Sequence, residues 1–334
     1  MIRFLNKRLK IFINFFLGPV LFVWLCYSIY RQIQTQDNLQ QSWDMILSSA
    51  SGSQSWKFIL VVLLLGANFG VEAFKWKVLV SSVQKISFWK AIKATLSGHA
   101  LVFNSINRFG ESAARSLYLD EGHRLKGMAI SMVGSMSLII VNFVIGLLGM
   151  LYMRFFILDA THQLEGLSMF WLTGLMSVLC FGTILLILMY YKLSWLIRLL
   201  EKIPLVARYR FVVENMERLD WWFLTKILLL SALRYVVFIA QYVLMMQVFE
   251  VEINMVDTAA LVTVMLLVLS IVPSITLAEL GIRGEVSLLL FGMLSNNLLG
   301  IIATTGSIWI INLIVPAIAG SVFLLGIRLF RNNK

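Results

Sequence analysis

Hydrophobic residues gather along this chain in blocks of about 20, separated by shorter polar stretches. A helix needs about 20 consecutive apolar residues to cross the hydrocarbon core of a bilayer. The pattern contains eight apolar segments of two kinds. Six are uninterrupted, and we expect each to be a full transmembrane helix: 11–30, 57–79, 127–152, 167–190, 223–249 and 299–325.

The other two segments, 88–119 and 258–294, carry polar and charged residues in their middle. Irregular backbone is tolerated at membrane depth only where surrounding protein shields it. We therefore expect each segment to be a re-entrant hairpin, a broken helix that returns to the side from which it entered. The predicted fold is all-α and polytopic. One membrane domain spans 1–334, with about six full transmembrane helices plus two hairpins.

Composition supports the membrane class. Of 334 residues, 60% are hydrophobic and 13% are charged, against about 25% charged in soluble domains. The net charge of +11 would favour nucleic acid in a soluble protein, but here the basic residues lie in loops between apolar blocks. We expect no nucleic-acid partner. The two cysteines and three histidines show no metal-ligand spacing, so we expect no metal and no cofactor.

The distribution of Lys and Arg predicts the orientation. Twenty-one of the 28 fall in segments predicted to be cytoplasmic, three in outer segments and four within the membrane region. Cytoplasmic loops of membrane proteins carry this excess. We therefore expect a multi-pass protein of the plasma (inner) membrane with both termini in the cytoplasm. The most basic loop, 191–221, is expected to face anionic lipid.

The two predicted hairpins share a short chemical pattern. The first contains Asn107-Arg108-Phe109-Gly110-Glu111, with Arg115 four residues after Glu111, so we expect these two side chains to share a helix face and pair. The second contains Glu279-Leu280-Gly281-Ile282-Arg283-Gly284-Glu285. Three full spans lie between them, so the second hairpin is inverted relative to the first. Inverted repeats with broken helices are typical of transporters.

This pattern favours binding of an anion at mid-membrane. A charged side chain at the bilayer centre costs at least about 3 kcal/mol, which pairing offsets. Glu111 and Glu285 are predicted at helix starts, where a carboxylate meets the positive end of the helix dipole. Arg108 and Arg283 then have the geometry to hold a phosphate by bidentate hydrogen bonds. The candidate substrate-binding residues are Arg108, Glu111, Arg115, Arg234, Glu279, Arg283 and Glu285.

A purely structural role is the alternative for these residues, because buried ion pairs often only fasten helices together. Arg234 in the span 223–249 either snorkels, pairs with Glu279 or meets substrate. His99 is expected to be a packing residue.

Around these motifs the chain resembles the lysylphosphatidylglycerol synthase transmembrane-region family, the flippase-like domain proteins. Members carry a Pro-Gly-Arg-x-Gly-Glu segment in the first half, where this chain has Asn107-Arg108-Phe109-Gly110-Glu111. They carry a Gly-x-Gly-x-Arg-Glu segment in the second half, where this chain has Glu279 in place of a glycine and Gly284 inserted before Glu285. The resemblance implies a membrane domain that moves phospholipids between leaflets, and nothing in the chain corresponds to the soluble aminoacyl-transferase domain of the synthases.

The leading hypothesis is translocation of a phospholipid or lipid-linked intermediate through a mid-membrane Arg/Glu site. The expected partners are membrane lipids with anionic phospholipid head groups, and no enzyme activity is expected. The chain shows no Gly-x-x-x-x-Gly-Lys-Ser/Thr phosphate loop. Two alternatives remain: a membrane-embedded enzyme acting on lipid phosphates, and an accessory or scaffold subunit that binds an envelope-synthesis enzyme.

Overall fold

A computed structural model describes residues 55–102, 109–158, 169–193, 195, 216, 219–272 and 276–331. Within these ranges the regular structure is helical, and no strand occurs. Five helical stretches are long and apolar enough to cross a membrane, which fits a multi-pass membrane protein. Five of the six predicted full spans are therefore confirmed as helices. The predicted span 11–30 and most of the basic loop 191–221 lie outside the described residues.

The five long stretches contain several elements. They are α3 (Ser55–Val80), α6 (Arg124–Tyr152) with the π-helical turn η3 (Met153–Ile157), α7 (Met169–Tyr191), α11 (Trp221–Val248), and α14 (Leu298–Trp309) followed by the π-helical turn η4 (Ile310–Ile314) and α15 (Val315–Arg331). The shorter elements are α4 (Phe88–Val102), α5 (Phe109–Ser116), the 3₁₀ turn η2 (Glu121–His123), α12 (Met255–Ile271) and α13 (Thr276–Phe291).

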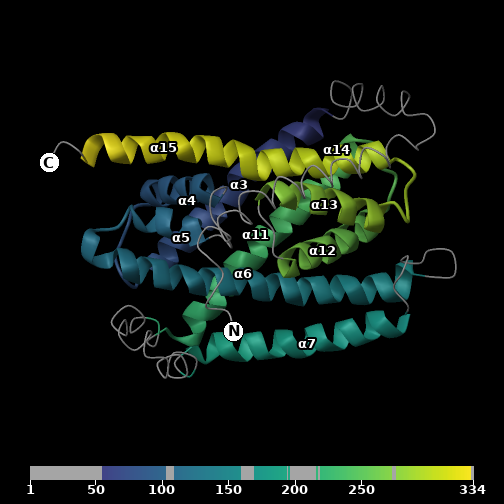
Figure 1. Ribbon diagram of the computed structural model, residues 1–334, viewed down its shortest axis with the longest axis horizontal. Coiled ribbons are helices and arrows are strands. Elements are labelled where there is room, and N and C mark those ends of the chain that lie inside the picture. The colour runs from purple at the N-terminus through teal and green to yellow at the C-terminus, as the bar shows by residue number, and fades with distance from the viewer. Residues whose placement is uncertain are drawn as a thin grey trace, which may run out of the picture.

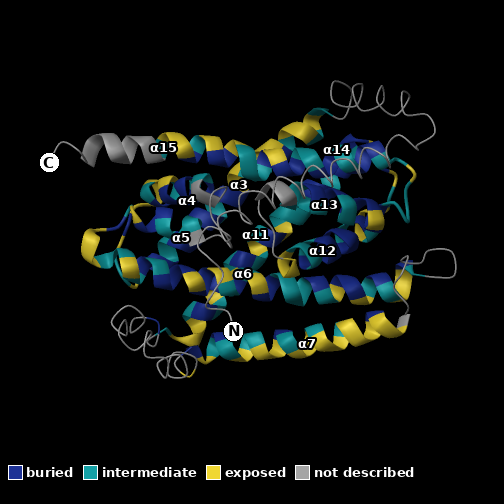
Figure 2. Cartoon of the chain, viewed as in Figure 1, coloured by how far each residue is buried: buried dark blue, intermediate teal, exposed yellow. Residues whose placement is uncertain are grey.

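Large apolar side chains cover the outside of the molecule. On α7, Trp171, Val178 and Phe181 are each about 70% exposed, and most of this helix is coloured as exposed or intermediate in Figure 2. A soluble protein rarely exposes apolar surface on this scale. Lipid acyl chains are the natural solvent for such a face.

The two short-helix pairs lie at opposite ends of the molecule. In Figure 1, α6 and α14–α15 run the length of the structure in opposite directions, with α4 and α5 between them at one end and α12 and α13 at the other. Helices α3 and α11 lie side by side through the middle, packed against each other. The centre of the molecule is therefore formed by α3 and α11.

The packing of the first half of the chain (α3 to α6) is repeated in the second half (α11 to α15). Helix α4 packs on α3 and α5, and α12 packs on α11 and α13. Helix α5 meets α6, as α13 meets α14. Across the halves, α4 packs along α15 and α12 packs along α6. Helix α7 is the one spanning helix of the described residues without a counterpart in this repeated packing.

Hydrogen bonds join the two loops that flank each short-helix pair. The Gln84 side chain, just after α3, donates to Asp120 Oδ2 and accepts from Asp120 N, both at 3.0 Å. In the second half, Asn297 Nδ2 donates to the backbone oxygen of Phe249 at 3.0 Å. Each pair of short helices thus leaves and returns to one end of the molecule.

Glycines allow the two cross-half contacts to be close. A Cβ at Gly149 of α6 would collide with Thr263 of α12, and a Cβ at Gly320 of α15 would collide with the backbone oxygen of Leu96 in α4. Small residues at helix crossings are typical of membrane proteins, since they let backbones approach.

Two predicted boundaries differ from the structure. The helix expected to start near Glu285 starts at Thr276, so Glu279 rather than Glu285 lies in its first turn. Gly281 and Gly284 indicated a break, but a helix interior tolerates glycine at a cost of about 1 kcal/mol each, which packing offsets. The helix before it starts at Met255 rather than at 258. The last helix continues through Pro316, which lies just after the π-helical turn η4. The i→i+5 hydrogen bonds of a π-helical turn leave room for a proline, which has no N–H to donate.

Candidate functional site

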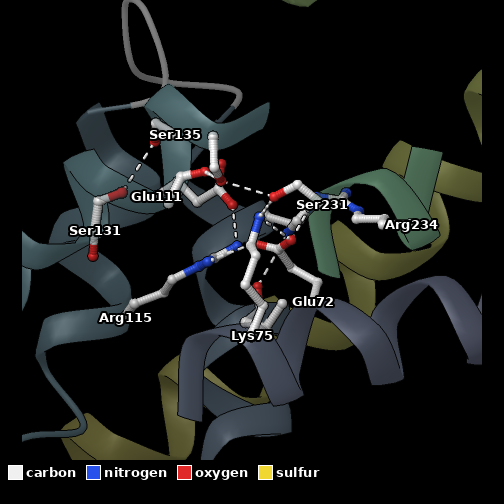
Figure 3. A network of polar contacts seen from close by, with 12 residues as sticks. Glu72, Lys75, Glu111, Arg115, Ser131, Ser135, Ser231 and Arg234 are labelled. Atoms are coloured by element: carbon white, nitrogen blue, oxygen red, sulfur yellow. Dashed lines mark hydrogen bonds and ion pairs between the residues drawn. The ribbon is translucent and has the colours of Figure 1, made fainter. Parts of the chain in front are cut away.

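Glu72 of α3 is the centre of a buried polar network (Figure 3). Its carboxylate is within 2.8 Å of Arg115 of α5, 2.8 Å of Arg234 of α11 and 2.9 Å of Lys75 one turn further along α3. Glu72 itself is only 3% exposed. Arg115 also pairs with Glu111 on its own helix, which confirms the shared face predicted from their spacing. We call Glu72, Lys75, Glu111, Arg115 and Arg234 the Glu72 cluster.

Uncharged side chains extend the cluster to two further elements. Arg234 donates from Nε to Asn68 Oδ1 at 2.7 Å, and Asn68 donates to Asn312 in η4 at 3.2 Å. On the other side, Lys75 donates to Ser231 of α11 at 3.3 Å, and the Ser231 hydroxyl lies 2.8 Å from that of Ser137 in α6. The network therefore joins α3, α5, α6, α11 and η4.

The cluster lies near the middle of the spanning helices. Arg234 is the fourteenth of the 28 residues of α11, and its partner Asn68 is the fourteenth of the 26 residues of α3; Glu72 and Lys75 are the eighteenth and twenty-first. The midpoint of a helix that crosses a bilayer lies near the bilayer centre. Charges there are costly and are typical of substrate or ion pathways.

The local sequence of α3 produces this arrangement. Asn68, Glu72 and Lys75 follow an i, i+4, i+7 spacing, so their side chains share one face of the helix. That face is turned inward, since Asn68, Glu72 and Lys75 are all at most 3% exposed. Gly98 of α4 leaves room for Glu111 and Arg115 of α5, because a Cβ at Gly98 would lie 3.0 Å from Glu111 Cγ and 3.2 Å from Arg115 Nε.

A second ion pair occupies the equivalent place in the other half. Arg283 of α13 pairs with Glu279 at 2.7 Å and donates to the Tyr242 hydroxyl of α11 at 3.0 Å. Glu111 and Glu279 are 168 residues apart, as are Arg115 and Arg283, and both pairs have i, i+4 spacing. The structural equivalence thus relates Glu111 to Glu279, whereas the sequence motif had related it to Glu285.

Both groups of charges contact α11. Arg234 and Tyr242 are eight residues apart on it, about 12 Å along the axis at 1.5 Å per residue. One central helix therefore contributes to both groups, with Arg234 in the Glu72 cluster and Tyr242 beside Arg283.

The predicted site residues have the following places. Glu111, Arg115 and Arg234 meet in the Glu72 cluster, and Arg234 has Glu72 and Asn68 as partners rather than Glu279, which was one of its alternatives. Glu279 and Arg283 form the second pair. Glu285 lies in the interior of α13. Arg108 lies outside the described residues.

Three buried residues of the site escaped prediction: Asn68, Glu72 and Lys75. The segment 57–79 reads as an ordinary apolar span, and Lys75, one of the 21 Lys and Arg assigned to cytoplasmic segments, is only 2% exposed. Their i, i+4, i+7 spacing was the available signal. His99, expected to be a packing residue, packs against Phe69 in an edge-to-face arrangement, with the two ring centroids 4.9 Å apart. Its Nδ1 lies 3.1 Å from the Thr95 backbone oxygen.

A scan against protein-family models finds no match to this chain, and a search of curated proteins finds none either.

Proposed function

We propose that this protein translocates a phospholipid or a lipid-linked intermediate between the leaflets of the plasma membrane, with both termini in the cytoplasm. The observation that carries the proposal is the Glu72 cluster, which brings together five charged side chains from α3, α5 and α11, with Arg234 at the middle of α11. The hydrocarbon core offers little to solvate a charged head group. A protein that moves one through needs fixed polar groups at this depth.

The paired packing of the two halves supports the same proposal. We infer that α4–α5 and α12–α13 are the two re-entrant hairpins of an inverted repeat, because each pair returns to one end of the molecule. Inverted repeats place substrate sites near the midplane, where the repeats meet. The Glu72 cluster lies at such a place, between α3 of the first repeat and α11 of the second.

The resemblance to the lysylphosphatidylglycerol synthase transmembrane-region family agrees with this proposal. It implies a lipid-moving membrane domain with arginine and glutamate in two broken helices. Under the proposal, Arg115 and Arg234 contact the head group, and the Glu279–Arg283 pair belongs to the second repeat.

The test uses purified protein in vesicles that carry fluorescently labelled phosphatidylglycerol, with a membrane-impermeant reductant to quench the outer leaflet. Wild type is expected to expose inner-leaflet label faster than protein-free vesicles. Arg234→Ala is expected to slow this at least about tenfold, since hydrogen bonds to charged groups are worth about 1.5–3 kcal/mol. Arg124→Ala is the matched control, because Arg124 lies at the start of α6 and pairs with the exposed Glu121.

Two results would contradict the proposal. One is a folded Arg234→Ala protein that moves lipid at the wild-type rate. The other is wild type that moves no labelled lipid. Chemical change of the lipid would point to the embedded enzyme instead, and mass spectrometry of the extracted lipid detects it.

A further inference from the structure

The guanidinium of Arg234 is held at two of its three nitrogens. Its Nε donates to Asn68 Oδ1 at 2.7 Å and its Nη1 donates to Glu72 Oε2 at 2.8 Å, while Nη2 makes no hydrogen bond to the described residues. The Arg234 side chain is 16% exposed, against 7% for Arg115. A guanidinium has five N–H donors, so Arg234 keeps donors, and some open surface, for a ligand.

Two asparagines extend this contact into the last spanning stretch. Asn68 is 1% exposed and donates from Nδ2 to Asn312 Oδ1 at 3.2 Å, and Asn312 donates from Nδ2 to the backbone oxygen of Ile308 at 3.2 Å. Chemistry fixes the direction of this chain, because arginine has no acceptor. Asn68 must turn its oxygen toward Arg234 and its NH2 toward Asn312. The Ile308 carbonyl, which can only accept, fixes the other end.

Asn312 reaches Asn68 from the π-helical turn η4. Such turns are rare within helices and frequently lie at functional sites. The corresponding helix of the first half, α6, is α-helical without interruption from Arg124 to Tyr152. The packing that the two halves share therefore does not itself require a widened turn. The hydrogen bond from Asn68 to Asn312 is what connects this turn to the Glu72 cluster.

We propose that Asn312 is a positioning residue for lipid binding: acting through Asn68, it holds the Arg234 guanidinium with its remaining N–H donors available to the phosphate of the head group. This inference rests on the proposed function. Anchors on two different nitrogens fix the plane of the guanidinium, whereas Glu72 alone would leave it free to turn. A side chain that is fixed before the ligand arrives loses less conformational freedom on binding, so the affinity is higher.

The experiment measures initial rates of movement of labelled phosphatidylglycerol in phosphatidylcholine vesicles as its mole fraction is raised. This separates the half-saturating mole fraction, KM, from the maximum rate, kcat. Asn312→Leu removes the link to Asn68, and Asn312→Asp keeps an oxygen that accepts from Asn68. Asn142→Leu is the matched control, because Asn142 of α6 is also partly buried and its side chain has no hydrogen bond among the described residues.

Asn312→Leu is expected to raise KM about five- to tenfold, the effect of one ordinary hydrogen bond, and to change kcat less than about twofold. Asn312→Asp and Asn142→Leu should leave KM close to the wild-type value. Asn68→Leu should raise KM at least as far as Asn312→Leu does. Adding Asn312→Leu to it should change KM no further, because Asn312 acts only through Asn68. Should Asn312→Leu fold poorly, Asn312→Ala removes the same hydrogen bond.

Three results would overturn the inference and leave the proposed function standing. The first is an unchanged KM in a folded Asn312→Leu protein, even if kcat falls, since that would indicate a purely structural role. The second is an equal rise of KM in Asn142→Leu. The third is a double variant in which the effects of Asn68→Leu and Asn312→Leu multiply. Wild type that moves no labelled lipid would contradict the proposed function, and this inference with it.

Discussion

At the residue scale, the shared carboxylate of Glu72 is the feature on which the site depends. Three cations from α3, α5 and α11 lie within 2.9 Å of it, and the side chain is almost fully buried. Removing one partner of a buried ion pair leaves charge without compensation, which costs about 3–5 kcal/mol in measured cases. Here a single substitution would leave Lys75 and Arg234 without their carboxylate.

Glu72→Ala is therefore expected to lower the free energy of unfolding in detergent micelles by about 3–5 kcal/mol. Glu252→Ala, the same change on an exposed loop, is expected to have an effect within about 0.5 kcal/mol. Denaturant or thermal unfolding followed by circular dichroism gives both values. Equal stabilities for the two variants would show that the cluster contributes nothing to the fold.

The sequence predicted part of this cluster. Glu111 and Arg115 were predicted to pair because i, i+4 spacing brings side chains together within one helix. Glu72 and Arg234 are 162 residues apart and meet only when α3 packs on α11, and local spacing carries no information on that contact. Lys75 looked like a cytoplasmic lysine because its burial depends on Ser231 and Glu72.

At the element scale, glycines decide how closely the two halves pack. Gly149 lets α6 approach α12, and Gly320 lets α15 approach α4. These are the two equivalent contacts between the first and second halves. A larger residue at either position has to displace backbone or a packed side chain. Overpacking of this kind typically costs about 1–3 kcal/mol.

Gly149→Leu and Gly320→Leu are each expected to lower the midpoint of thermal unfolding in detergent. Gly182→Leu on α7 is the control, because nothing lies within 4 Å of a Cβ at that position. Leucine there should be neutral or slightly stabilising, since it favours a helix more than glycine does. A control that is as unstable as the other two would mean that added bulk, rather than helix contact, is responsible.

Element boundaries were predicted well where apolar periodicity was uninterrupted, as in the spans that became α3 and α11. They were predicted less well in α13, whose glycines and charges indicated a break. Glu279 and Arg283 stabilise that first turn by their own ion pair, and α12 and α14 pack around it. Tertiary contacts of this kind override local helix propensity.

At the scale of the whole molecule, the exchange of packing between halves has a consequence for topology. If α4–α5 is re-entrant, the loops before and after it lie on one side of the membrane, as the Gln84–Asp120 hydrogen bonds require. The loops around α12–α13, joined by Asn297, then lie on the other side, since the three spans α6, α7 and α11 separate them from the first pair of loops. A single crossing in place of the hairpin would put the flanking loops on opposite sides and could not bring them together.

Single cysteines introduced into a Cys26→Ser/Cys180→Ser background test this arrangement with a membrane-impermeant maleimide on intact cells. Ser81→Cys and Gly122→Cys, both at exposed positions, are expected to react only after permeabilisation. Glu252→Cys and Asn296→Cys, also exposed, are expected to react on intact cells. Labelling of Gly122→Cys but not Ser81→Cys from outside would mean that α4–α5 crosses the membrane. The inverted repeat would then be lost, and with it the reason for placing the Glu72 cluster at the junction of two opposed halves.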